Sequence, residues 1–407
     1  MNKITQLIFL VLFPFLPFWA WILSLVRHTE IEMFLTIVLV PIAFYLMITP
    51  KINFPKYLTF FTLFTVYHLC SVYINDLVPP ETTSLKFFLA DREVLACFFF
   101  FVTENTHFDE RFIRIMSRNI FFVVGISLIV SLLQLKNPSF FVRPSIIANI
   151  NNETFLSENR IFSIYSWLDL NSLGITFPIL IAILLSLFSH KKMASPIIIL
   201  SGIIVSFLTK ARYVMISAII VFSQLFFTSK INFSKKVSIL IIFAGSILIS
   251  MSIAKTLGYN IQQVIDERVL EKSTNMGSAN ARILSFYVFL KVFPDHPLLG
   301  VGPQTSAEVV RLLGGRAPII HVGYLSYLYF YGLTGCFLLF VAIFFMLRRA
   351  WIIGSKNEFW AGFFGLLAFC FANTTMVYFN FSEMGIVLVF IYLRYYSEKS
   401  ELELSAT

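Results

Sequence analysis

The sequence contains few charged residues for its length. Asp, Glu, Lys and Arg make up 13% of its 407 residues, whereas 58% of the residues are hydrophobic. A soluble domain carries about 25% charged residues. This deficit, together with repeated apolar runs long enough to cross a bilayer, argues against a soluble protein. It indicates an all-α polytopic membrane protein.

Cysteine is rare, and the common catalytic motifs are missing. The four cysteines, Cys70, Cys97, Cys336 and Cys370, lie inside apolar runs without paired spacing. This pattern argues against a disulfide framework and against a cysteine metal site. The sequence contains no Walker motif, HExxH, GxSxG or Cys/His metal spacing. We therefore expect neither a metal nor a cofactor.

The chain has a net charge of +9. A basic balance can indicate nucleic-acid binding, but membrane proteins concentrate Lys and Arg in their cytoplasmic loops. Here the basic residues cluster in alternate short turns, at 51–56, 111–118, 191–192, 230–236 and 348–356. We therefore expect no nucleic-acid partner, and we expect both termini in the cytoplasm.

The apolar runs predict about twelve transmembrane helices. They span about 6–26, 31–49, 57–75, 84–103, 115–135, 170–189, 194–209, 212–229, 237–254, 321–347, 358–376 and 381–396. Four regions follow: helices 1–9 in 1–254, a long periplasmic loop in 255–320, helices 10–12 in 321–396, and a cytoplasmic tail in 397–407.

The fourth expected span is interrupted by three adjacent charged residues, Asp91, Arg92 and Glu93. A charge inside a span must face protein or a water-filled cavity. Alternatively, the span begins after these residues and they lie near the outer interface. The sequence does not choose between the two interpretations.

The long loop is expected to be helical. Residues 260–272, 281–293 and 306–313 have helical periodicity, and 298–303 (LLGVGP) reads as a tight turn. In 281–293, Leu284, Tyr287, Val288 and Val292 would form one apolar face, with Arg282, Ser285 and Lys291 as the polar members. Gly300 and Gly302 permit a positive φ or a close approach of the backbone.

Basic side chains and one histidine gather in the segments expected on the outer side: Arg160, Lys210, Arg212, Arg282, Arg311, Arg316 and His321. Arginine donates planar, bidentate hydrogen bonds to phosphate oxygens, and histidine accepts a proton near neutral pH. Together they suit the displacement of a pyrophosphate leaving group by an activated hydroxyl. The alternatives are structural: Arg212 snorkels to lipid phosphates, Arg282 lies on the polar face of its helix, and His321 is an interfacial histidine.

Several short motifs resemble the O-antigen ligase and O-antigen polymerase superfamily. They are 280–282 (NAR), 295–303 (DHPLLGVGP), 321–325 (HVGYL) and 331–335 (YGLTG), with weaker support from 160–163, 171–174 and 208–212. The resemblance covers roughly 160–335, and the run 295–303 is its most specific part. It implies a GT-C-like fold with a long periplasmic loop between helices 9 and 10.

The resemblance also implies an activity. Such proteins transfer glycans from an undecaprenyl-pyrophosphate carrier at the periplasmic face of the bacterial inner membrane, without a metal. By resemblance, Arg212 and Arg282 would hold the pyrophosphate, and His321 would activate the acceptor hydroxyl. Further substrate contacts would come from Arg160, Lys210, Arg311, Arg316 and Tyr324. The expected partners are the carrier-linked glycan, an acceptor glycan or lipid A–core, a chain-length regulator and membrane lipids.

One departure from the family pattern concerns the acceptor. The family often has Asn after the histidine, where this chain has Val322.

Polymerase is the preferred interpretation, because the loop is modest in size. The first alternative is a ligase that passes the chain to lipid A–core. The second is a flippase for lipid-linked oligosaccharides, which would need working charges inside the spans.

Overall fold

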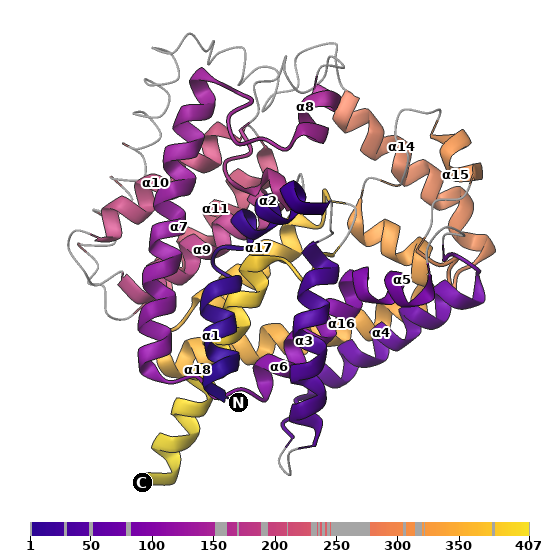
Figure 1. Cartoon of the computed structure of the whole chain (residues 1–407). Helices are drawn as coiled ribbons and strands as arrows, with labels where there is room; N and C mark the ends of the chain where they lie inside the picture. The colour runs from indigo at the N-terminus through magenta and orange to yellow at the C-terminus, as the bar shows by residue number, and fades with distance from the viewer. Residues whose placement is uncertain are drawn as a thin grey trace.

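The structure is a computed structural model, and it contains only helices within the residues it describes (Figure 1). The described residues are 2–27, 31–48, 52–78, 83–150, 161–168, 171–188, 194–209, 211–228, 234, 237, 241, 245, 277–303, 307–313, 320, 322–376 and 379–406. Most of the expected segments 237–254 and 260–272 lie outside them. The all-helical expectation is confirmed for the described part of the chain.

Three described helices are long and apolar enough to cross a membrane: α4 (Lys56–Ile74), α7 (Glu110–Lys136) and α16 (Gly323–Asn357). An α-helix rises 1.5 Å per residue, so about 20 residues cross the roughly 30 Å hydrocarbon core. These helices indicate a membrane protein. By length and composition, the described residues support three spans, or four with one bent helix pair, rather than the twelve expected.

Two of the expected spans are broken. The first is divided into α1 (Asn2–Leu12) and α2 (Leu16–Arg27), which are bent by 78°. Pro14 lies in the gap, lacks a backbone N–H, and disfavours helical geometry at the residue before it. The fourth is divided into α5 (Ser84–Ala90) and α6 (Arg92–Glu104). Asp91 separates them with an extended backbone and accepts a hydrogen bond from Val94 N, which caps α6.

The centre of the bundle is α9 (Ser172–Phe188). All of its residues from Ser172 to Leu185 are buried, which is the pattern of a helix that is apolar on every side. It packs against α7, α10 (Ala194–Leu208), α11 (Arg212–Phe227), α17 (Ala361–Ala372) and α18 (Met384–Ala406). These helices form a single hydrophobic core, to which α3 (Ile31–Met47) also contributes.

Three of the remaining helices lie in the upper part of the view in Figure 1: α8 (Pro144–Ile150), α14 (Gly277–Val292) and α15 (Ala307–Leu312). Two short 3-10 turns are η1 (Tyr165–Trp167) and η2 (Phe293–Asp295). α14 contacts α15, η2 and α16. Both chain termini lie at the lower part of the same view.

α4 runs between two ends of the bundle, which we name the Glu104 end and the Asn75 end. At the Asn75 end, α16 begins against the end of α17. A Cβ added at Gly323 would lie 2.6 Å from the carbonyl oxygens of Asn373 and Met376. Tyr327, one turn into α16, donates a hydrogen bond to Glu93 at the start of α6. The start of α16 and the start of α6 therefore share this end.

The start of α11 lies at the Asn75 end as well. Tyr213 packs on Gly174, so closely that a Cβ on Gly174 would overlap its ring. Gly174 belongs to the start of α9, and Thr176 on that helix accepts a hydrogen bond from Gly385 N at the start of α18. The N-termini of α6, α9, α11, α16 and α18 are therefore gathered at one end of the bundle.

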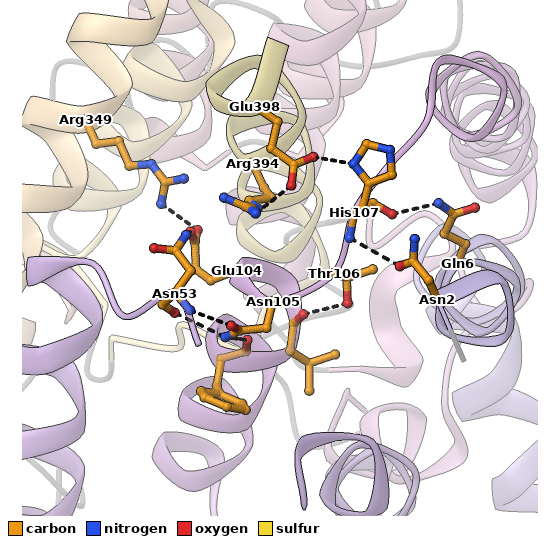
Figure 2. Close-up of polar contacts among 12 residues, drawn as sticks. Asn2, Gln6, Asn53, Glu104, Asn105, Thr106, His107, Arg349, Arg394 and Glu398 are labelled. Atoms are coloured by element: carbon orange, nitrogen blue, oxygen red, sulfur yellow. Dashed lines mark hydrogen bonds and ion pairs between the residues drawn. The ribbon is translucent and has the colours of Figure 1, made fainter. Parts of the chain in front are cut away.

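A polar cluster ties the opposite, Glu104 end together (Figure 2). Glu104 has no exposed surface, and it accepts hydrogen bonds from Tyr57 Oη at 2.8 Å and Asn53 Nδ2 at 3.2 Å. Arg349, from the far part of α16, forms an ion pair with the same carboxylate. Nearby, His107 Nδ1 lies 2.8 Å from Glu398 of α18. Four separate helices are thus joined at this end.

Replacing Glu104 by alanine is expected to destabilise the protein by about 3–5 kcal/mol, because it leaves the Arg349 charge buried without its partner. The measurement is the midpoint of thermal unfolding in detergent. Glu110→Ala is the matched control, since its pair with Arg114 is exposed on both sides and contributes little. Equal midpoints for the two variants would show that the Glu104 cluster does not hold the helices together.

Candidate functional site

α16 is broken at Gly332, and another part of the chain fills the break. Gly332 has φ 61° and ψ −167°, which is not helical. Four backbone hydrogen bonds join the break to segment 297–302: Leu333 N to Pro297 O (2.9 Å), Thr334 N to Leu298 O (3.1 Å), Val301 N to Tyr329 O (3.2 Å) and Gly302 N to Phe330 O (2.8 Å). The segment thus satisfies backbone groups that the break leaves without helical partners.

Glycine is required on both sides of this junction. A Cβ at Gly300 would lie 2.3 Å from Phe330 O, and a Cβ at Gly332 would lie 2.3 Å from Leu298 O. Gly300 and Gly302 have φ values of 70° and 85°. The sequence predicted a positive φ or a close backbone approach at these two glycines; the positive φ is confirmed for both, and the close backbone approach for Gly300. The partner, Gly332, was not predicted.

Tyr67 of α4 supports the junction from the side. Its hydroxyl oxygen lies 2.7 Å from Leu299 O and 3.1 Å from Tyr331 O, so it can donate a hydrogen bond to segment 297–302 or to α16. The end of α4 also contacts the segment, because a Cβ at Gly302 would lie 2.7 Å from Leu77. The segment is therefore held by α16 and by α4.

A buried hydrogen-bond chain lies behind the junction. His68 Nε2 lies 2.7 Å from Asp91 Oδ2, and His68 Nδ1 lies 2.9 Å from Tyr331 Oη. Because a carboxylate only accepts, Nε2 carries the hydrogen, and for a neutral imidazole the Tyr331 hydroxyl then donates to Nδ1. His68 is 3% exposed and Tyr331 is 2% exposed. The chain links α4, the α5–α6 break and α16 next to Gly332.

The other two charged residues of the α5–α6 break also face protein groups. Glu93 Oε1 accepts a hydrogen bond from Tyr327 Oη at 3.1 Å. Arg92 Nε donates to Glu32 Oε1 at 3.1 Å. All three side chains thus face protein partners, as the first interpretation of this cluster expects, and a new helix begins at Arg92, as the second expects.

His68, Asp91 and Glu93 form a group that could hold a metal ion, since one ligand atom from each lies within 4.8 Å of the others. Both His68 nitrogens, both Asp91 oxygens and Glu93 Oε1 already have protein hydrogen-bond partners. A metal would have to replace the bond between His68 and Asp91. The ligand atoms of these three residues are already engaged in hydrogen bonds within the protein. This arrangement fits a structural role better than metal ligation.

The structure places part of the predicted site. Arg282 is half-buried in the first half of α14, and Arg311 is exposed in the last turn of α15. Tyr324 Oη donates to Cys370 O at 2.8 Å, which orients this side chain between α16 and α17. Four predicted residues lie outside the described part of the chain: Arg160, Lys210, Arg316 and His321.

Two predicted residues mark the starts of helices. Arg212 is the first residue of α11. Val322 caps α16, so residue 321 directly precedes that helix. Both helix starts lie at the Asn75 end. A helix N-terminus carries partial positive charge and unsatisfied N–H groups, which favour an anion.

One residue of the junction was missed at the sequence level although a pattern could have indicated it. His68 stands alone in the apolar run of α4. A polar ionisable residue inside a span needs a partner, and the interrupted span with Asp91 offered one. The pairing of His68 with Asp91 was not predicted, because the two residues are 23 positions apart and do not belong to the same helix.

A small cavity at the same end is not a substrate site. It encloses about 20 Å³ among α2, α3, α6, α9 and the segment before α18, with Glu32, Arg92, Ser172 and Glu383 as polar lining. That is room for about one water molecule. Glu383 accepts hydrogen bonds from Ser172 at 2.8 Å and Thr176 at 3.2 Å, so the cavity belongs to a packed polar contact.

Comparison with known proteins gives no relative. No protein-family model matches the chain, and no curated protein matches it. A function is therefore inferred from the residues and the geometry of the Asn75 end.

Proposed function

We propose that this protein is a polysaccharide polymerase of the bacterial inner membrane, which extends glycans carried on undecaprenyl pyrophosphate. One observation carries the proposal. Two separate motifs of the resemblance, 295–303 and 331–335, form a single unit in the structure, joined by four backbone hydrogen bonds around Gly332. If the two similarities were due to chance, the two segments would have no reason to contact each other. Glycines would also not be expected at the points of contact.

The gathered helix starts support an anionic substrate. Arg212 opens α11 and His321 immediately precedes α16, and both helices begin at the Asn75 end. α14, which carries Arg282, is tied to α16 through the junction. Two helix N-termini at one end of the bundle, with Arg212 at one of them and Arg282 on a helix that contacts α16, favour a pyrophosphate.

In the proposed reaction, His321 takes the proton from a hydroxyl of the acceptor sugar. The hydroxyl oxygen then forms a bond to the anomeric carbon of the donor glycan. The bond between that carbon and the pyrophosphate oxygen breaks, and the electron pair leaves with undecaprenyl pyrophosphate. Arg212 and Arg282 stabilise the departing anion, a type of contribution that is commonly worth about 100-fold or more in rate.

Orientation is part of the proposal. Lys56, Arg114, Arg348 and Arg349 belong to the Glu104 end or to the helix turns nearest to it. The positive-inside rule assigns a base-rich end to the cytoplasm. The Asn75 end then faces the periplasm, where carrier-linked repeats are polymerised, and both termini face the cytoplasm.

The flippase alternative loses its main support. It depended on charges inside the spans that are available to a substrate, with Asp91, Arg92 and Glu93 as the examples. In the structure each of these side chains is paired with a protein group. The ligase alternative shares the donor and differs only in the acceptor.

The purified protein, mixed with a defined undecaprenyl-pyrophosphate-linked repeat unit, is expected to produce carrier-linked chains of increasing length. Product size is measured by gel electrophoresis and mass spectrometry. Transfer only when lipid A–core is added would identify a ligase instead. The enzyme would be refuted if no glycan were transferred to either acceptor. Movement of the carrier-linked glycan across the membrane of proteoliposomes would then favour the flippase. In cells lacking the protein, single repeats in place of a ladder would agree with polymerase.

A further inference from the structure

α14 is apolar on two opposite faces. Its inner face, Ser285, Val288, Phe289 and Val292, is buried against the core. Its outer face consists of large apolar side chains that no described residue covers: Ile283 (56% exposed), Phe286 (49%), Tyr287 (65%) and Leu290 (52%). Of the apolar face expected from the sequence, Val288 and Val292 are buried and Leu284 is half-buried, but Tyr287 is exposed, and the polar member Ser285 is buried.

This outer face continues into the surface of two candidate spans. Leu298 and Leu299 follow α14 and are 63% and 65% exposed. The segment that contains them is bonded to α16 and to Tyr67 of α4. On these two spans, the large apolar side chains Leu63, Val66 and Ile74 of α4 and Leu333 and Phe337 of α16 are also exposed, with Thr334 as an exposed polar neighbour. The apolar surface therefore extends from the spans to α14.

This exposed apolar surface is suited to contact with lipid. Contiguous apolar patches of this kind are rare on a surface in water, and a helix that is apolar all round is covered by a protein core or by a membrane. The surfaces of α4 and α16 on which the patch continues belong to helices that can cross a membrane. The flanking cations Arg282 and Lys291 have long side chains that can reach the polar headgroups.

The length of α14 decides how it meets the membrane. Its 16 residues extend about 24 Å, which is shorter than the roughly 30 Å hydrocarbon core. We propose that α14 is a non-spanning membrane helix, whose Ile283–Phe286–Tyr287–Leu290 face lies in the hydrocarbon edge of the bilayer. The occupant of this face is bilayer lipid, and the proposal does not depend on the enzymatic activity.

The position of Arg282 follows from this placement. It precedes Phe286 by four residues, or about 6 Å along the helix axis. Both residues therefore lie on the same side of the helix, and with Phe286 in the hydrocarbon edge the long Arg282 side chain can extend to the lipid phosphates. If the proposed function holds, the pyrophosphate of a membrane-anchored carrier lies at that same level, so donor and arginine meet without extraction of the lipid from the bilayer.

The test uses the full-length protein in vesicles of phosphatidylethanolamine and phosphatidylglycerol. In a background with the four native cysteines replaced by alanine, a nitroxide label is attached to Phe286→Cys or Leu290→Cys. Its relaxation is measured with oxygen, which concentrates in lipid, and with a water-soluble nickel chelate. Phe337→Cys is the reference for lipid and Asp295→Cys the reference for water, since both side chains are exposed.

Labels at 286 and 290 are expected to match the label at 337, with high oxygen and low nickel accessibility. High nickel accessibility, as at 295, would show that the face lies in water and would overturn the proposal. Low accessibility to both reagents would show a protein cover and would also overturn it. Two labelled sites on the exposed face allow the test to proceed if one variant fails to insert. Glycan transfer is a separate measurement, so failure here leaves the proposed function to its own assay.

Discussion

Replacing Gly332 by alanine is expected to separate segment 297–302 from α16 and to abolish glycan transfer. The φ of 61° with ψ of −167° is a conformation that essentially only glycine adopts, and an added Cβ would lie 2.3 Å from Leu298 O. Backbone strain and the loss of the four junction hydrogen bonds together cost more than about 3 kcal/mol. The measurements are the thermal unfolding midpoint in detergent and the yield of carrier-linked chains.

The chain offers a matched control for this substitution. Gly125 lies inside α7, and a Cβ added there meets nothing within 4 Å. Gly125→Ala should leave activity intact and stabilise the helix by up to about 1 kcal/mol. Gly300→Ala tests the other side of the junction, since its Cβ would lie 2.3 Å from Phe330 O. If Gly332→Ala and Gly300→Ala both unfold at the wild-type temperature, the junction is not a rigid unit.

Replacing Arg282 by alanine is expected to lower the rate of glycan transfer by about 100-fold or more, because a positive charge that stabilises the departing pyrophosphate is removed. Arg282 is half-buried on α14, which leaves part of the side chain accessible to a substrate. Arg282→Lys keeps the charge but loses the planar, bidentate geometry, so we expect an intermediate rate. The rate is measured on purified protein with a defined carrier-linked repeat.

Lys291 supplies the control for charge. It is an exposed cation in the last turn of the same helix, and it has no part in the proposed site. Lys291→Ala should therefore retain the wild-type rate within a small factor. Unchanged unfolding midpoints for all three variants would assign the loss to chemistry. A normal rate for Arg282→Ala would remove this arginine from the mechanism and leave the enzyme reading to Arg212 and His321.

Local patterns predicted the features that depend on a few neighbouring residues. Apolar composition predicted an all-helical membrane protein. Gly300 and Gly302 predicted a turn with positive φ, because few other residues adopt it. The interrupted span at Asp91 predicted partners from other helices, and His68 of α4 is such a partner. Each of these features follows from the chemistry of one short segment.

Local patterns were insufficient where two segments compete for the same surface. The periodicity of 281–293 placed Tyr287 on one apolar face with Val288 and Val292, and this assignment was wrong for Tyr287, which is exposed, whereas Val288 and Val292 are buried. When nearly every position of a helix is apolar, periodicity does not identify the buried side. The bend between α1 and α2 and the break at Asp91 also divided runs that hydropathy alone joined.

The sequence by itself determined that the chain is helical and membrane-bound, which residues are basic, and where glycine allows a turn. Only the tertiary structure decided that segment 297–302 fills a break at Gly332, that Tyr331 pairs with His68 across 263 residues, and which face of α14 packs on the core. Hydropathy and backbone preference are properties of each residue and its neighbours. A hydrogen bond or a packed face between distant segments exists only when the whole bundle brings both partners together.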